Sequence, residues 1–267
     1  MVNDYTMDKS LIKPNQKLED KLDNIILSEK EVQEVTEKVV GKTLLTAVFE
    51  SLGLGGVVKV FETSEEVKKE INERKKAYLI TSYLSEVDNI EEEIYKLKTF
   101  VSDPAGNTLF NKIIRIVNNN HPNKEYVILL SKILKKITNS DFQKLFSSHI
   151  YALNQIEKLT PQALIVLADY ASWPEYTIGN YASQGGTITT EWTETFSEYY
   201  TTHKNITDEA IKRRVAHSIK ELVRTDLIQS YIQGERDSKE LSSMKESTSK
   251  AVCDFTDLGR EIVEYIG

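Results

Sequence analysis

The chain has 267 residues, of which 40% are apolar and 28% charged, a composition typical of a folded protein rather than a disordered one. Its formal net charge of −7 argues against broad, nonspecific nucleic-acid binding, which needs a positive surface to displace the counterions of the phosphates. The single cysteine, Cys253, cannot form an internal disulfide, and residues 1–30 contain no apolar signal-peptide core. We therefore expect a cytoplasmic protein.

The first sixty residues predict an arm, a helix and a corner. Residues 1–27 are polar and mixed in charge, and we expect them to form a flexible N-terminal arm. Ser28 and Glu31 have the spacing of a capping box, which predicts a helix from this point. The stretch 44–61 is apolar but contains two charges and three glycines, so it does not suit a spanning helix. We expect a buried hairpin corner here, with contact to a membrane surface as the alternative.

A long helix is predicted next. Thr63 and Glu66 repeat the capping signature, and neither Gly nor Pro interrupts the chain before Pro104, which predicts one nearly continuous helix over 64–101. Its second half carries an apolar stripe with alternating steps of four and three: Tyr83, Val87, Ile90, Ile94, Leu97 and Val101. This spacing packs one helix face against a partner helix. We favour packing inside a bundle over a dimeric coiled coil, because three heptads are few.

The residues up to 158 continue as helices joined by short loops. We expect a turn at 103–107, a short helix over 109–117, a helix over 124–137, and a further helix that a capping box of Ser140 and Gln143 opens. Successive helices with short connections predict a helical bundle over residues 28–158.

Residues 159–267 predict a winged helix-turn-helix domain. The expected order is a helix opened by Thr160 and Pro161, a shorter helix near 192–203, a helix over 208–225 capped by Thr207, strands at 227–233 and 251–256, and a last helix capped by Thr256. The two strands form a small two-stranded β wing around a polar loop. The predicted fold is thus mainly α, a helical bundle followed by a winged helix-turn-helix.

The sequence motifs that could indicate catalysis or ligand binding are weak. The sequence VVGKT at 39–43 resembles the end of a phosphate-binding loop, but it lacks the first glycine and a preceding strand. The four histidines have no metal-ligand spacing with one another or with Cys253. We therefore predict a non-enzymatic protein with no catalytic residue, no cofactor and no metal.

The remaining candidate is a group of bases on the predicted 208–225 helix. Its members are Lys212, Arg213, Arg214, Lys220 and Arg224. Bases near the start of such a helix suit contacts with DNA, but residues 207–267 hold ten bases and twelve acids, and a DNA-binding module usually presents more positive charge. We expect these residues to contact a partner, with a protein favoured and DNA as the alternative.

Four segments carry a family resemblance. They are GLGGVVKVFETSEEVKKEINERKKAYLITSYL, LTPQALIVLADYA, IKELVRTDLI and FTDLGREIVEYI. Together with the layout of about residues 45 to 267, they resemble the bacterial Abi-alpha (abortive-infection alpha) proteins. The resemblance implies a bacterial cytosolic protein with a helical bundle, a winged helix and a role in phage defence, and it supplies no catalytic residues.

Overall fold

The computed structural model describes residues 17–24, 49–50, 52, 67–85, 87–179, 181–184, 186–233 and 249–266. Most of the predicted N-terminal arm, most of the helix from Ser28, most of the 44–61 corner and the loop 234–248 lie outside these residues. None of the helices in the described ranges combines the length and the apolar character that crossing a membrane requires. Residues 18–23 of the expected flexible arm instead form a short helix, α1 (Leu18–Asp23), in which Leu18 and Leu22 are buried, so the prediction of an arm is wrong for these residues.

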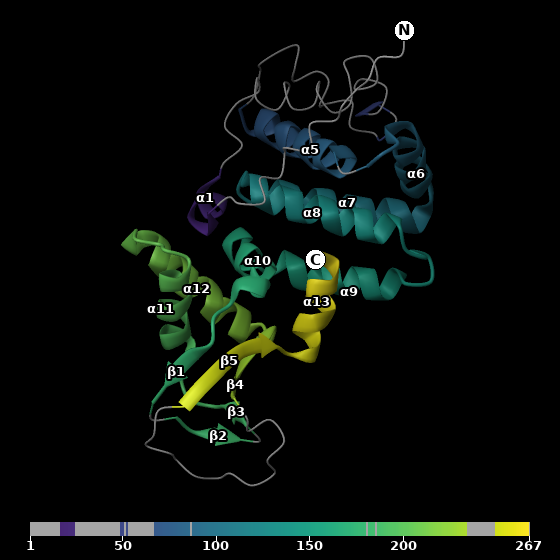
Figure 1. The fold of residues 1–267 in the computed structure, drawn as a ribbon. Helices are drawn as coiled ribbons and strands as arrows, with labels where there is room; N and C mark the ends of the chain where they lie inside the picture. Colours follow the sequence, from purple (N-terminus) through teal and green to yellow (C-terminus); the bar gives the residue numbers. More distant parts are fainter. Residues whose placement is uncertain are drawn as a thin grey trace. The chain divides into compact units, whose positions relative to one another are not determined.

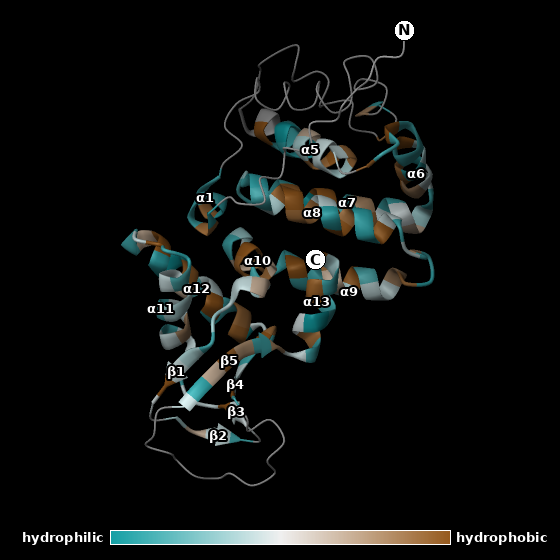
Figure 2. Ribbon diagram, in the orientation of Figure 1, coloured by the Kyte–Doolittle hydropathy of each residue, from teal (hydrophilic) through white to brown (hydrophobic). Residues whose placement is uncertain are grey.

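The described chain divides into two compact units, residues 20–157 and residues 158–265. The first unit is helical (Figure 1). Its main helices are α5 (Val67–Ser85), α6 (Ile90–Ser102), α7 (Pro104–Asn119), α8 (Lys124–Thr138) and α9 (Phe146–Glu157). Helix α8 packs against α5, α6 and α7, and α7 also packs against α9. Apolar segments, brown in Figure 2, run along α8, which is the predicted 124–137 helix.

The predicted continuous helix over 64–101 is wrong, because the chain leaves the helical conformation between α5 and α6. Asn89 has an extended backbone (φ −124°, ψ 97°), and its side chain accepts a hydrogen bond from the backbone N–H of Glu92 at 3.2 Å. This is an N-cap, and the acidic residues 91–93 that follow are favourable at the positive end of a helix. The predicted stripe is buried at Tyr83, Ile94 and Leu97 and half-buried at its other positions.

Two further boundaries in the first unit differ from the prediction. The expected turn at 103–107 is instead the start of α7, because Asp103 accepts the N–H groups of Ala105 and Gly106 and Pro104 occupies the first helical position. The expected capping box at Ser140 is also wrong. The Ser140 hydroxyl donates to the carbonyl of Ile137, and α9 begins six residues later at Phe146.

The second unit combines helices with an antiparallel sheet. Its elements are α10 (Pro161–Ala168), the 3₁₀ turn η2 (Tyr170–Ser172), β1 (Tyr176–Ile178), β2 (Ser183–Gln184), β3 (Thr187–Ile188), α11 (Thr193–His203), α12 (Glu209–Arg224), β4 (Ile228–Ile232), β5 (Ser249–Phe255) and α13 (Asp257–Ile266). The four predicted helices and both predicted strands of this region are confirmed. Thr160 caps α10, and the Thr256 hydroxyl accepts the N–H of Gly259 in α13, as expected.

The sheet has five strands in the order β1-β5-β4-β3-β2. The two expected strands, β4 and β5, do pair with each other, but the prediction of only two strands is wrong. Residues 176–178 alternate buried, exposed, buried along β1, which pairs with the first residues of β5. Gly186 (φ 80°) allows the tight turn between β2 and β3, a backbone conformation that suits glycine. These three strands are two or three residues long, too short for a periodic pattern to reveal them.

Aromatic side chains form the core of the second unit. Phe196 of α11 is fully buried, and its ring lies 5.4 to 5.9 Å from the rings of Trp173, Tyr176, Trp192 and Tyr200. These ring contacts connect α11 to β1 and to the segment before β1. Stacked and edge-on ring pairs at such distances stabilise a core beyond simple burial.

Candidate functional site

Local signals in the turn after α11 fix the start of helix α12. Asn205 has a left-handed backbone (φ 55°), and the N–H of Ile206 donates back to the carbonyl of Thr201, which closes α11 in a Schellman motif. Asp208 then caps α12, since its side chain accepts the N–H groups of Ala210 and Ile211 at 2.6 and 3.1 Å. The predicted cap Thr207 is therefore off by one residue.

The end of α12 is fixed in the same way. Asp226 has a left-handed backbone (φ 58°), and the N–H of Leu227 donates to the carbonyl of Leu222. This second Schellman motif leads directly into β4. The first and last residues of α12 are thus fixed by the segments on either side of the helix.

The buried face of α12 follows the helical period of its apolar residues. Ile211, Val215, Ile219 and Leu222 are all at most 5% exposed. Helix α12 packs against α10 and α11, so this face forms part of the core of the second unit.

Part-buried polar contacts hold both ends of α10. At its start, the Glu221 carboxylate on α12 accepts the N–H and the hydroxyl of Thr160 at 2.7 and 2.8 Å. At its end, the Asp169 carboxylate accepts the Tyr200 hydroxyl at 2.6 Å and pairs with Lys204 at 2.7 Å. Burial, followed by the nearby Asp169 charge, raises the pKa of Tyr200, so the phenol stays neutral. These contacts fix α11 and α12 relative to α10.

We expect Glu221→Ala to lower the free energy of unfolding by about 2 kcal/mol, because it leaves the part-buried Thr160 N–H and hydroxyl without their acceptor. Glu198→Ala is the matched control, since Glu198 is exposed on α11. Urea unfolding of both variants measures the difference. Equal stabilities would mean that Glu221 does not hold α10.

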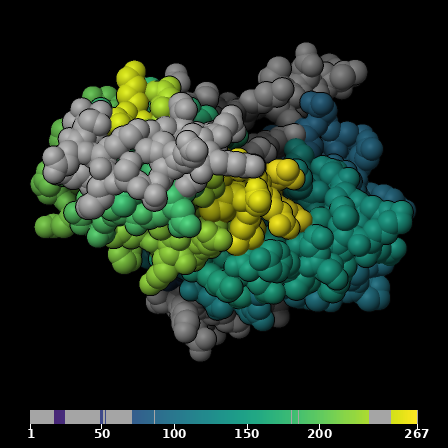
Figure 3. Space-filling view, turned by 90° about the horizontal axis from the view of Figure 1, so that it is seen from below, coloured from purple at the N-terminus to yellow at the C-terminus, as the bar shows by residue number. Residues whose placement is uncertain are grey.

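The exposed face of α12 presents a line of bases. Arg213, His217, Lys220 and Arg224 are exposed and follow one another at steps of four, three and four residues. We call these four residues the basic row; it extends over roughly 16 Å at 1.5 Å per residue. No large apolar side chain is exposed among the residues of α12, all of which the structure describes. In Figure 3 the green to yellow-green stretch of the chain, which includes α12, forms part of the molecular surface.

The predicted contact residues fall into two groups. Arg213, Lys220 and Arg224 belong to the basic row, and Arg214 is exposed beside it. Lys212 is half-buried and pairs with Glu209 at 2.7 Å, so it contributes less to this surface. His217 was not predicted, although its spacing from Arg213 could have revealed it.

Two carboxylates from the segment around the start of α11 meet the middle of the basic row. The Lys220 ammonium lies 2.9 Å from Glu194 and 3.4 Å from Glu191. The hydrogen bond with Glu194 is the main cause that raises the pKa of Lys220, and the same bond lowers the pKa of Glu194. All three side chains are more than 40% exposed, so these pairs add little to stability. Their main effect is instead to change the net charge at the middle of the basic row.

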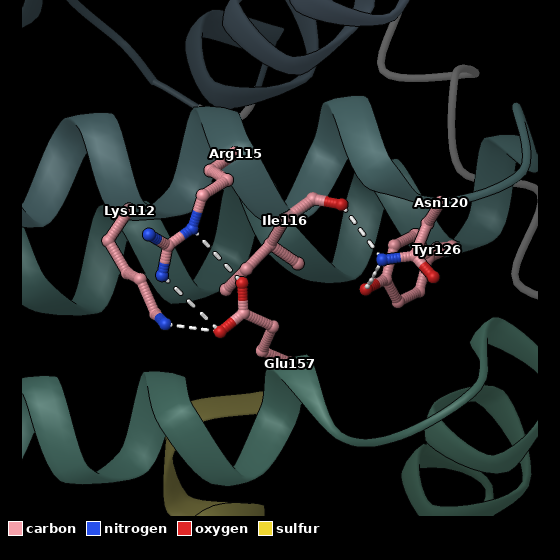
Figure 4. A network of polar contacts seen from close by, with 6 residues as sticks. All are labelled: Lys112, Arg115, Ile116, Asn120, Tyr126 and Glu157. Atoms are coloured by element: carbon pink, nitrogen blue, oxygen red, sulfur yellow. Dashed lines mark hydrogen bonds and ion pairs between the residues drawn. The ribbon is translucent and has the colours of Figure 1, made fainter.

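A second polar network lies in the first unit (Figure 4). Glu157 of α9 accepts hydrogen bonds from Lys112 and Arg115 of α7, and Asn120 donates to the Ile116 carbonyl and to the Tyr126 hydroxyl. Every charged group in this network has its partner within the unit. We therefore assign it a structural role in joining α7 to α9.

We expect Glu157→Gln to lower the free energy of unfolding by about 2 kcal/mol at neutral pH, because Lys112, 9% exposed, loses its counter-charge. Lys112, and then Arg115, lower the pKa of Glu157 from its ordinary value of 4.5. The stabilisation is thus present above that value and lost as the pH falls through the folded pKa. Urea unfolding of both proteins at neutral and strongly acid pH should show the difference shrinking in acid, and a difference independent of pH would contradict this assignment.

Other chemistry finds no support in the described residues. In these ranges no three His, Cys, Asp or Glu side chains gather as metal ligands would. Burial raises the pKa of the Cys253 thiol in β5, which disfavours the nucleophilic thiolate. The candidate site is therefore the exposed face of α12. A search of protein-family models, curated proteins and solved structures finds no significant match to the chain.

Proposed function

We propose that the chain is a non-enzymatic interaction protein whose second unit is a winged helix and whose macromolecular partner binds the basic row. The order α10-β1-α11-α12-β4-β5 supports the winged helix, with β2 and β3 as an inserted hairpin. So does the pairing, in which β5 lies between β1 and β4. In this arrangement α12 takes the place of the second, partner-contacting helix of a helix-turn-helix.

The basic row is the observation that carries this proposal. Its guanidinium groups at Arg213 and Arg224 are exposed and, among the described residues, form no ion pair. Their helix is fixed by two Schellman motifs and by the buried Glu221 contact. Cations on a fixed helix favour an anionic group on the partner, and arginine binds carboxylates through two parallel hydrogen bonds.

A protein with surface carboxylates is the preferred partner. Arginine is enriched at protein interfaces, and the ten bases and twelve acids of residues 207–267 give this region no net positive charge. DNA is the second candidate, because Arg213 and Arg214 lie near the start of α12, where a helix-turn-helix contacts bases. The resemblance to Abi-alpha proteins supports a regulatory role in phage defence in the bacterial cytosol.

Amine-specific cross-linking in cells that carry the gene tests the proposal. Lys220 and Lys212 place primary amines on and beside the basic row. We expect partner cross-links at these lysines, and about tenfold less captured partner from the variant Arg213→Glu/Arg224→Glu. Lys136→Glu/Lys144→Glu, two exposed positions of the first unit, is the control with the same change of charge. Equal capture by both variants would refute α12 as the contact helix.

A further inference from the structure

The middle of the basic row is not positive. Lys220 is its third member, and two carboxylates approach its single ammonium group at 2.9 and 3.4 Å. Glu191 and Glu194 are 68% and 71% exposed, so both face any molecule that binds along α12. The surface therefore alternates in charge: Arg213 positive, the Lys220 cluster negative by one, and Arg224 positive.

This alternation is unfavourable for a phosphate backbone. Duplex DNA carries one negative charge for about every 1.7 Å of its axis, so several phosphates would face a row roughly 16 Å long. Phosphates near Lys220 would meet two carboxylates at much less than a Debye length of about 8 Å. Glu194 also lies in the first turn of α11, where its carboxylate offsets the positive end of the helix dipole.

A protein surface can match the same alternation. Its carboxylates can pair with Arg213 and Arg224, while its own lysine or arginine pairs with Glu191 and Glu194. DNA offers no cation for these two glutamates. Their exposure and position thus discriminate between the two partner classes that α12 could contact.

We infer that Glu191 and Glu194 are specificity-determining residues that exclude nucleic acid from the basic row and admit a protein of mixed surface charge. This inference rests on the proposed role of α12 as the contact helix. The two glutamates affect binding rather than stability, because ion pairs as exposed as theirs contribute little to the free energy of folding.

The test measures binding of a short, random-sequence DNA duplex at low salt by fluorescence anisotropy. Glu191→Gln/Glu194→Gln should bind the duplex about tenfold more tightly than the wild-type chain, with a salt dependence steeper by about one phosphate contact, because Lys220 is released. Glu198→Gln/Glu264→Gln changes the net charge equally at exposed positions of α11 and α13 and should change binding less than about twofold. Adding Arg213→Ala and Arg224→Ala to the first variant should abolish the gain.

Two results would overturn the inference: equal affinity of the two glutamine variants, or wild-type binding as tight as that of Glu191→Gln/Glu194→Gln. Thermal melting of both variants checks that they remain folded. A different result would refute the proposed function alone. If the gain in DNA affinity depends on Arg213 and Arg224 while the cross-linked partner is retained by Arg213→Glu/Arg224→Glu, the exclusion of nucleic acid stands and the assignment of α12 as the partner-contact helix falls.

Discussion

Replacing Gly259 with alanine is expected to lower the free energy of unfolding of the second unit by about 3 kcal/mol. A Cβ at this position would lie 1.9 Å from the carbonyl oxygen of Leu227 and 3.2 Å from the Cβ of Phe255. The first of these atoms belongs to the backbone and accepts a hydrogen bond from the N–H of Thr256 at 3.1 Å. The start of α13 would have to move away from Leu227, and this hydrogen bond would weaken.

The sign of the change distinguishes this close approach from helix propensity. Alanine normally stabilises a helix relative to glycine by about 1 kcal/mol, so a loss can only come from the contact with Leu227. Both tryptophans of the chain, Trp173 and Trp192, belong to the second unit, and their fluorescence during urea unfolding reports on it. Glu261→Ala, at an exposed position of the same helix, is the control. A Gly259→Ala protein as stable as the wild type would contradict the close approach of α13 to Leu227.

Replacing Leu97 with alanine is expected to lower the free energy of unfolding of the first unit by about 2–5 kcal/mol, because it leaves a cavity in the bundle. Leu97 is fully buried on α6, in the predicted stripe with Tyr83 and Ile94. Far-UV circular dichroism during urea unfolding follows the helices of both units, and the transition of the second unit is identified by its tryptophan fluorescence. Tyr95→Ala on the same helix is the control, since Tyr95 is 73% exposed and should cost less than about 0.5 kcal/mol. Similar losses for the two variants would show that the stripe is not core.

Local signals in the sequence predicted the second unit well. Thr160 followed by Pro161 marks the start of α10, and Thr256 caps α13, because an N-cap depends on residues within one turn. The apolar face of α12 followed from its period. The same pair of signals occurs at Asp103 and Pro104, where a turn was expected, and there it opens α7.

The other differences between the predicted and the observed structure have physical causes that cannot be recognised in a single sequence. The break between α5 and α6 contains neither Gly nor Pro, and it depends on the Asn89 side chain competing for the N–H of Glu92. The strands β1, β2 and β3 are too short for an alternating pattern and take their conformation from pairing. In the candidate site, Glu191 and Glu194 lie 29 and 26 residues before Lys220. Only the tertiary fold brings them to the basic row.

Hydrogen exchange of the full chain, alone and with the partner captured by cross-linking, tests the role of α12 most directly. The partner should slow exchange in residues 204–224, which span the turn before α12 and the basic row, and leave α6 and α8 of the first unit unchanged. Arg213→Glu/Arg224→Glu should remove that protection without changing exchange in the chain alone. Protection confined to the first unit, with residues 204–224 exchanging as fast as in the free chain, would contradict α12 as the contact surface.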